Sequence, residues 1–253
     1  MRVLITFALA NEFAAWRKLR RFRNVSRDTW DQTYAVRVGV ADVVVVLTGV
    51  GRFAAQRALA HAFDGDPEVC IASGLSGGLN PCYFPGDILA ARTVADVSGT
   101  RMVYSDAELV SFAETSGAKV VDRFLVSDRV ISTAEEKQSL KSLGDAVDLE
   151  SVYVLAAAGQ RGVRAVAIRA ISDGAESNLP LDFDRVFNER GAVSLPKVVA
   201  QVVRRPNRIA GLLRLAHESE RATAALARFL DGYVQQLASG PLPELAKAEA
   251  VAI

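Results

Sequence analysis

The segment DAVDLESVYVLAAAGQRGVRAVAIRAISD, residues 145–173, decides the fold and carries a carboxylate at each end of its central elements. The alanine-rich part, Ser151–Gln160, predicts a helix, and the β-branched run Val163–Ile171 predicts a buried strand. Glu150 precedes the helix and Asp173 follows the strand. Because α/β sheets bind ligands at the carboxyl ends of their strands, we expect both carboxylates in one crevice there. Two acids in separate environments can divide the binding of a sugar and the donation of a proton.

The rest of the chain alternates short apolar runs with helical patterns, which predicts an α/β fold. The further strands that we expect are Val3–Phe7, Tyr34–Val38, Val43–Leu47, Val69–Ser73, Ile88–Ala91 and Leu125–Val130, and the further helices are Glu12–Phe22, Arg52–Phe63 and Ala134–Leu143. The strand Tyr34–Val38 is expected to pair antiparallel with Val43–Leu47. We therefore predict a single domain over residues 1–195, with a central mixed, mostly parallel sheet covered by helices.

The chain changes character after Pro196. Two helices are predicted there, at Lys197–Val203 and from Ile209 to about Leu237, so residues 196–238 are expected to form a helical C-terminal extension. Residues 239–253 are rich in Ala, Pro, Glu and Lys and are expected to be a flexible tail.

Composition excludes several classes of protein. The net charge of +1 over 253 residues gives no reason to expect nucleic-acid binding. The two cysteines, Cys70 and Cys82, form neither a disulfide framework nor a CxxC metal pair, which fits a reducing cytoplasm. The chain has no apolar run of about 18 residues, so no membrane span is expected. We expect a cytoplasmic protein without a metal or an organic cofactor.

Two glycine-rich segments each follow a predicted strand, at Gly49-Val50-Gly51 and at Gly74-Leu75-Ser76-Gly77-Gly78. Glycine allows close backbone approach to a ligand, and turn amides can hold an anion. Tight turns between a strand and a helix use the same residues. Neither segment is a Walker A loop, because no Gly-Lys-Ser/Thr follows.

Four polar residues, at three places in the chain, are candidates for the site, and each place is weighed against a structural role. Glu12 follows the first predicted strand, where it is either a site residue or a carboxylate favoured in the first turn of a helix. Arg169 lies within an apolar strand and is costly to bury unless it meets a carboxylate or an anion. Ser172-Asp173 at the end of that strand is either a site or a helix N-cap.

Taken together, these motifs resemble the nucleoside phosphorylase and nucleosidase superfamily, which includes methylthioadenosine/S-adenosylhomocysteine nucleosidase and purine nucleoside phosphorylase. The resemblance covers residues 1 to about 184. It rests on five short motifs in the correct order, namely Glu12 after the first strand, Thr48–Gly51, Ser73–Leu79 followed by Gly86-Asp87-Ile88, Val147–Glu150 and Arg169–Asp173. It implies cleavage of the N-glycosidic bond of a purine nucleoside, without a metal or cofactor.

The resemblance implies roles in catalysis for four residues. Asp173 would be the general acid that protonates the imidazole-ring nitrogen of the purine, because an anionic purine is a poor leaving group. Ser172 would orient Asp173. Glu12, with Arg169 nearby, would position and activate the attacking water.

The resemblance also implies a set of substrate-binding residues. Glu150 would accept hydrogen bonds from the ribose hydroxyls as positive charge develops at the anomeric carbon. Leu149 matches a position that lies against the ribose. Val130 and Ile131 match the stretch that binds the base.

The chain departs from the nucleosidase pattern at two places. Leu75 stands where the nucleosidases have a Ser that helps to hold the nucleophile, so Ser76, next to Gly77, is the alternative for that role. Val130 stands where an aromatic residue usually stacks on the base, which implies a wider and more apolar pocket. A phosphorylase-type phosphate loop near Glu12 is missing, which favours water over phosphate as the nucleophile. The alternative phosphate ligands are Arg52 and an arginine from a neighbouring subunit.

A narrower resemblance joins the chain to the hopanoid-associated branch of the superfamily, whose substrate is adenosylhopane. It rests on Ser127–Lys137, on Glu150-Ser151 and on the Arg/Leu-rich tail. Basic residues Arg204, Arg205, Arg208 and Arg214 beside leucines 212, 213 and 215 would allow peripheral contact with an anionic membrane. The family resemblance implies a homodimer or a larger assembly. A nucleoside-binding protein of the same fold without turnover is the alternative function.

Overall fold

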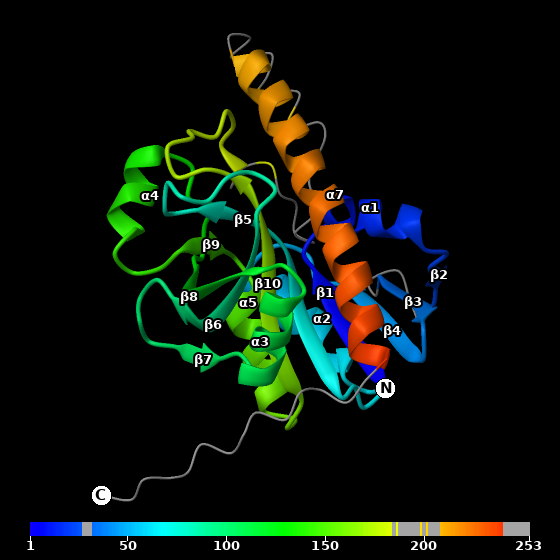
Figure 1. Ribbon diagram of the computed structural model, residues 1–253. Coiled ribbons are helices and arrows are strands. Elements are labelled where there is room, and N and C mark those ends of the chain that lie inside the picture. The colour runs from blue at the N-terminus through cyan, green and yellow to red at the C-terminus, as the bar shows by residue number, and fades with distance from the viewer. Residues whose placement is uncertain (27–31, 184–185, 187–197, 199–200, 202–207, 240–253) are drawn as a thin grey trace, which may run out of the picture.

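Residues 1–26, 32–183, 186, 198, 201 and 208–239 are described by the computed structural model (Figure 1). The strands are β1 Arg2–Phe7, β2 Arg23–Asn24, β3 Thr33–Val38, β4 Ala41–Leu47, β5 Val69–Gly78, β6 Ile88–Asp96, β7 Met102–Tyr104, β8 Lys119–Val126, β9 Ala146–Asp148 and β10 Arg164–Asp173. The helices are α1 Ala10–Leu19, α2 Arg52–Ala62, α3 Ala107–Thr115, α4 Ala134–Leu140, α5 Ser151–Gly159 and α7 Ile209–Ser239.

The strands form one mixed sheet in the order β10-β6-β8-β9-β5-β1-β4-β3-β2, with β7 paired to β6. The central strands β4, β1, β5 and β10 pair in parallel. Since β10 pairs with both β5 and β6, and β9 pairs with both β5 and β8, five strands close into a ring. The predicted α/β fold with a mixed, helix-covered sheet is confirmed.

Helices cover both faces of the sheet because the strand residues alternate in direction. Val3, Ile5 and Phe7 of β1 join a core that α1, α3 and α7 complete. Leu4 points to the opposite face and joins a second core, to which α2 and α5 contribute.

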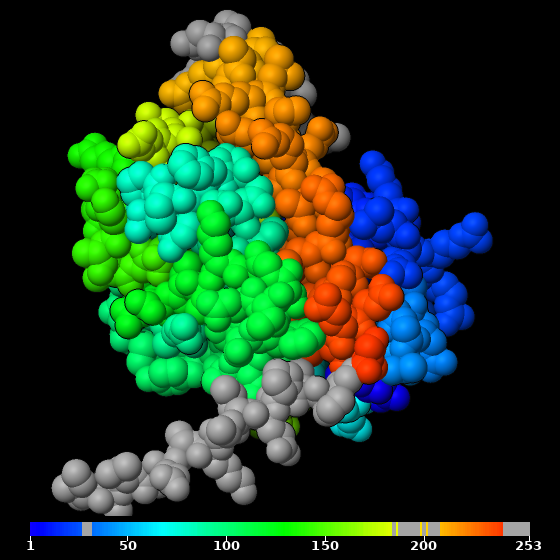
Figure 2. Space-filling model, viewed as in Figure 1, coloured from blue at the N-terminus to red at the C-terminus, as the bar shows by residue number. Residues whose placement is uncertain are grey.

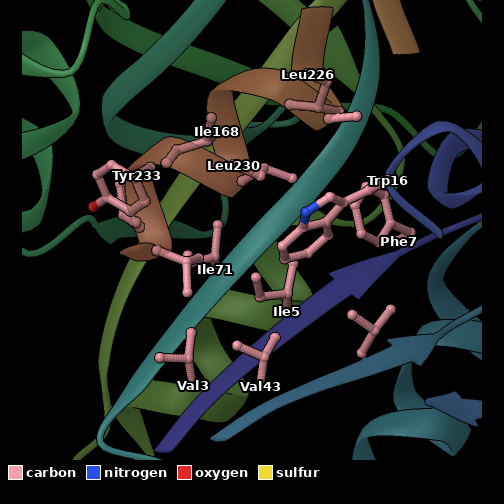
Figure 3. Packing of buried hydrophobic residues seen from close by; sticks show 14 of the residues in the cluster. Val3, Ile5, Phe7, Trp16, Val43, Ile71, Ile168, Leu226, Leu230 and Tyr233 are labelled. Carbon is pink, nitrogen blue, oxygen red and sulfur yellow. The ribbon is translucent and has the colours of Figure 1, made fainter. Parts of the chain in front are cut away.

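The long helix α7 belongs to the first core. Figure 2 shows it at the surface along the length of the molecule, and Figure 3 shows its buried side, where Leu226, Leu230 and Tyr233 pack near Ile71 and Ile168. The hydroxyl of Tyr233 donates a hydrogen bond to the carbonyl of Leu109 at 2.9 Å. The predicted helix from Ile209 is therefore an integral part of the core.

Several predicted boundaries are wrong. The strand predicted to end at Ser73 continues to Gly78, because Gly74 and Gly77 pair with Arg169 and Asp173 of β10. The strand predicted at Leu125–Val130 is β8, which ends at Val126, so Val130 lies in a loop. The first helix ends at Leu19 instead of Phe22, and the fourth at Leu140 instead of Leu143.

Other elements were not predicted or cannot be compared. The sequence patterns missed β2, β7, α3 and β9. Of the predicted helix Lys197–Val203 only residues 198 and 201 are described, and the predicted tail from residue 240 lies outside the described residues. Among the helices that the structure describes, none combines the length and the apolar character needed to cross a bilayer.

Candidate active site

Strand register brings the two carboxylates of the 145–173 segment to one pocket. Asp173, the last residue of β10, pairs with Gly77 of β5, and Gly77 also pairs with Val147 of β9. Glu150 follows β9 by two residues and stands at the N-terminus of α5. Glu150 and Asp173 both line a pocket of about 230 Å³.

Ten of the eleven predicted site residues line this pocket. They are Glu12, Leu75, Ser76, Gly77, Val130, Ile131, Leu149, Glu150, Ser172 and Asp173. Arg169 is the exception, because it lies behind the wall and is only 1% exposed.

Arg169 is the centre of a buried charge cluster. Its Nε and Nη2 donate to Oγ of Ser151 at 3.1 and 2.9 Å. Nε also lies 3.2 Å from Oδ2 of Asp148, and Nη2 lies 3.8 Å from Oε2 of Glu150. The first of these is an ion pair without a hydrogen bond, because the N–H of Nε is directed at Ser151. The expectation that a buried Arg169 lies beside a carboxylate is therefore confirmed, since both Asp148 and Glu150 are close to its guanidinium.

Glu12 has a structural and a site contact at once. Its Oε2 accepts from the backbone N–H of Leu9 at 2.9 Å, which caps α1, and its Oε1 accepts from the N–H of Leu75 at 2.8 Å. Burial raises the pKa of Glu12, and the charge of Arg169 and these backbone N–H groups oppose that rise. The two readings of Glu12 do not exclude each other.

Glu150 is held by the first glycine segment. Its Oε1 accepts from the backbone N–H of Gly51 at 2.8 Å, so this amide binds a carboxylate of the chain itself. Burial raises the pKa of Glu150 to about 8; Arg169 lowers it, whereas Asp148 and Glu12 raise it further. The charge of Glu150 therefore depends on pH near neutrality.

Asp173 has two polar partners that approach different oxygens. The hydroxyl of Ser172 donates to Oδ1 at 2.6 Å, and Nζ of Lys137 donates to Oδ2 at 2.5 Å. Residues 174–182, which follow Asp173 directly, form turns and loop, so no helix begins there and the N-cap reading of Ser172-Asp173 is wrong.

The segment with Leu75 and Ser76 contributes both backbone and side chain. Leu75 uses its N–H for Glu12, and the carbonyl of Ser76 lies 3.2 Å from Oγ of Ser172. Within the described part of the chain, the buried Oγ of Ser76 and Nη1 of Arg169 have no hydrogen-bond partner. Buried polar atoms of this kind are expected to bind a polar ligand atom or water.

Most of the remaining pocket wall is apolar and comes from four parts of the chain, although Asn11, Arg129, Asp148 and Ser219 also line the pocket. Val130 and Ile131 precede α4, and Val147 and Leu149 flank the end of β9. Leu215 of α7, with Leu179 and Phe183, completes the wall. The apolar wall and the few polar groups are typical of a small-molecule site.

Some site residues were missed by the sequence reading. Lys137 is the most important, because it is fully buried against Asp173. One local pattern could have found it: Lys137 lies between Ala134 and Leu140 at helical spacing, on the side that α4 turns inward. No comparable sequence pattern indicated that Leu215 lines the pocket. Among the described residues, no group of three His, Cys, Asp or Glu side chains could hold a metal ion.

Comparison with known proteins gives one family match. Residues 2–204 match the model of the phosphorylase superfamily. The 5′-methylthioadenosine/S-adenosylhomocysteine nucleosidase of Shewanella halifaxensis is 27% identical over 187 residues, which cover 63% of this chain and 80% of that protein. The protein of the same name from Anoxybacillus flavithermus is 26% identical over 236 residues, which cover 82% of this chain and 100% of that protein.

Solved structures share the fold at lower identity. A futalosine hydrolase mutant of Helicobacter pylori has a TM-score of 0.72 at 16% identity, covering 94% of this chain and 100% of that one. The 5′-methylthioadenosine/S-adenosylhomocysteine nucleosidase of Helicobacter pylori has a TM-score of 0.72 at 17% identity, covering 94% and 99%.

Proposed function

The chain belongs to the phosphorylase superfamily, and from this premise we propose that it hydrolyses the N-glycosidic bond of a purine nucleoside. One observation carries the proposal. Asp173, Glu150 and Glu12 line a single pocket whose other walls are largely apolar. Three of the four carboxylates that line this site match the three tasks of this reaction, which are to protonate the base, to hold the ribose and to activate water. The fourth, Asp148, pairs with Arg169.

Asp173 is the general acid in this proposal. As the bond between C1′ and the purine breaks, its electron pair moves onto the base, and a proton from Asp173 stops the base from leaving as an anion. Ser172 holds Oδ1 at 2.6 Å and so sets the direction of the carboxyl group. The apolar residues Val130 and Ile131 would hold the base by van der Waals contact.

Glu150 holds the ribose in this proposal. Gly51 fixes Oε1, and the ribose hydroxyls would donate to the carboxylate as positive charge grows at C1′. The raised pKa of Glu150 reflects burial, and hydrogen bonds from the sugar would favour its ionised form.

Glu12 and Arg169 would position and activate the attacking water. Oε1 of Glu12 and Nη1 of Arg169 both lie over Gly74, since a Cβ there would be 2.9 and 2.5 Å from them. A water beside this pair could give its proton to Glu12. Arg52, the alternative phosphate ligand, is exposed, and its guanidinium lies 6.0 Å from the centre of the Tyr153 ring outside the pocket. This arrangement favours water over phosphate.

The base and the 5′ substituent are the finer part of the proposal. We propose adenine as the base and an apolar group at the ribose 5′ carbon, such as the hopane of adenosylhopane. Leu179, Phe183 and Leu215 support this choice, because they extend the apolar wall. An apolar substituent would gain about 25 cal/mol for each Å² that it buries there.

Release of free base tests the proposal. The substrates are adenosine, methylthioadenosine, S-adenosylhomocysteine and an adenosine with a long alkyl group at the 5′ carbon, each with and without phosphate. We expect adenine release without phosphate, fastest from the alkyl compound. Strict dependence on phosphate would make the protein a phosphorylase. Binding by thermal shift without any release would favour the alternative, a nucleoside-binding protein without turnover.

A further inference from the structure

Lys137 is a fully buried cation whose contacts place it behind the proposed general acid. Its relative exposure is 0%, and it is the buried residue of α4, which lies at the edge of the molecule beside β8 and β9 (Figure 1). A lysine is rarely buried to this degree unless its charge is paired. The pairing must therefore offset the loss of hydration of the ammonium group.

The ammonium group uses all three of its N–H donors on one short stretch of chain. Nζ donates to Oδ2 of Asp173 at 2.5 Å, to the carbonyl of Gly174 at 2.8 Å and to the carbonyl of Ser177 at 3.1 Å. An ammonium has three donors and no acceptor, so this set is complete. The ion pair with Asp173 is the one salt bridge of Lys137 that the described residues show.

The charged neighbours of Lys137 are engaged elsewhere. Glu136, the preceding residue, accepts from the backbone N–H groups of Ser132 and Thr133 and pairs with Arg129 at 2.7 Å. Asp145, after α4, accepts from the hydroxyl of Tyr83 and the N–H of Arg123. Asp173 is therefore the acid to which Lys137 is directed.

This pairing raises a question about the acid. Nζ of Lys137 donates to Oδ2 of Asp173 at 2.5 Å, whereas a general acid must itself give a proton to the leaving base. The proton can reach the base only if it first moves from Lys137 to the carboxylate.

Resting on the proposed nucleosidase activity, we propose that Lys137 supplies, through Asp173, the proton that the leaving purine takes up. One Nζ–H bond breaks and an O–H bond forms on Asp173. The carboxyl group then gives a proton to the imidazole-ring nitrogen, while the electron pair of the C1′–N bond passes to the purine. Water adds to C1′ and loses its proton to Glu12. After the products leave, Glu12 releases that proton to solvent and solvent returns one to Lys137, so the enzyme is restored.

A second role for the same contacts would be mechanical. By binding the carbonyls of Gly174 and Ser177, Lys137 joins α4 to the loop that carries Leu179 into the pocket wall. Arginine separates the two roles. A guanidinium can keep the charge and the hydrogen bonds, but it does not release a proton in a folded protein.

The test compares K137R, K137M, D173N and the double variant K137M/D173N with the wild-type enzyme, with the nucleoside that the wild-type enzyme cleaves fastest. We expect K137R and K137M to lower kcat by about 100-fold or more while KM changes by less than about threefold. The double variant should be no slower than D173N, because Lys137 acts only through Asp173. Lys141, exposed at the end of the same helix, provides the matched controls K141R and K141M, which should behave as wild type.

Each other outcome overturns the inference in a recognisable way. Near-normal kcat in K137R would leave Lys137 a mechanical role only. A double variant slower than D173N by the full factor of K137M would show that Lys137 acts independently of Asp173. Absence of base release from the wild-type enzyme would instead overturn the proposed function itself. Thermal melting of each variant checks its fold, and K137Q replaces K137M if that variant does not fold.

Discussion

Gly74 and Arg169 are register partners on β5 and β10, and a Cβ on Gly74 would lie 2.5 Å from Nη1 of Arg169. The head of Arg169 cannot move away easily, because Ser151 and Asp148 hold it. The backbone of Gly74 also has φ of +142°, where side chains are rarely tolerated. Glycine is therefore required at this position for the charge cluster to form.

We expect G74A to displace Arg169 and Glu12, and thus to lower both stability and base release. Gly86 provides the matched control, since its φ is +99° but no atom lies within 4 Å of an added Cβ. G86A should show the backbone strain alone, about 1–2 kcal/mol. Urea unfolding and kcat measure the difference, and equal losses in both variants would contradict the crowding argument.

Removal of Arg169 should destabilise the protein strongly. R169M leaves Asp148 and Glu150 buried without their cation, at a cost of about 3–5 kcal/mol in the free energy of unfolding. The control is R92M on β6, whose ion pair with Asp122 is exposed and contributes less than about 1 kcal/mol. Chemical denaturation at pH 9, above the raised pKa of Glu150, distinguishes the two, and an R169M variant as stable as the wild type would contradict the pairing of Arg169 with these carboxylates.

The role of Asp173 is tested by D173N. We expect kcat for base release to fall by about 10²–10⁴, because an amide cannot donate a carboxylic proton to the purine. Binding of a non-cleavable nucleoside analogue should persist. D122N, at an exposed carboxylate of β8, is the control for the substitution itself. Turnover of D173N at the wild-type rate would refute the assignment.

Glu12 should affect chemistry more than binding. In E12Q the amide oxygen can serve only one of the two backbone donors, Leu9 or Leu75, and cannot take a proton from water. We expect kcat to fall by about 100-fold or more, with the Kd of an analogue nearly unchanged. E114Q on the exposed side of α3 serves for comparison. An unchanged rate in E12Q would reduce Glu12 to a helix cap.

The raised pKa of Glu150 predicts pH-dependent binding. If the ribose hydroxyls donate to the carboxylate of Glu150, the nucleoside binds to the ionised form. In the free protein, the fraction of ionised Glu150 decreases as the pH drops below about 8. The Kd of a nucleoside analogue should therefore rise as pH falls from 9 to 6, with proton release on binding. Calorimetry in buffers of different ionisation enthalpy measures both effects.

In E150Q this pH dependence should disappear and affinity should be weaker throughout. A wild-type Kd that is flat over the same range would show that Glu150 does not change its charge on binding.

The same pKa sets a pH trend in stability. Between the ordinary carboxyl range and about 8, the folded state holds a proton on Glu150 that the unfolded state has lost. Stability therefore falls as pH rises through that window. The melting temperature of E150Q relative to wild type should rise from pH 6 to pH 9, and a constant difference would contradict the burial argument.

Most of the fold could be predicted because its patterns are local. The strand of Val163–Ile171 and the helix from Ser151 were placed within two residues, since β-branched and alanine-rich runs have distinct periods. The glycine-rich end of β5 was not, because the sequence Gly74–Gly78 is typical of a turn until β9 and β10 are present to pair with it. β9, with three residues, is too short to show a period.

By itself, the sequence determined the α/β class with its longer strands and helices, the carboxylates at the ends of the 145–173 segment and the need of Arg169 for an anionic partner. Only the tertiary structure decided which groups meet: Lys137 with Asp173, the amide of Gly51 with Glu150, and Leu215 with the pocket. The first two contacts join residues that are 36 and 99 positions apart in the sequence, and the third brings α7 to the pocket. Strand register and helix packing set such contacts, and both depend on how the whole core packs. The spacing of apolar residues along the chain indicates only which side of a strand or helix is buried.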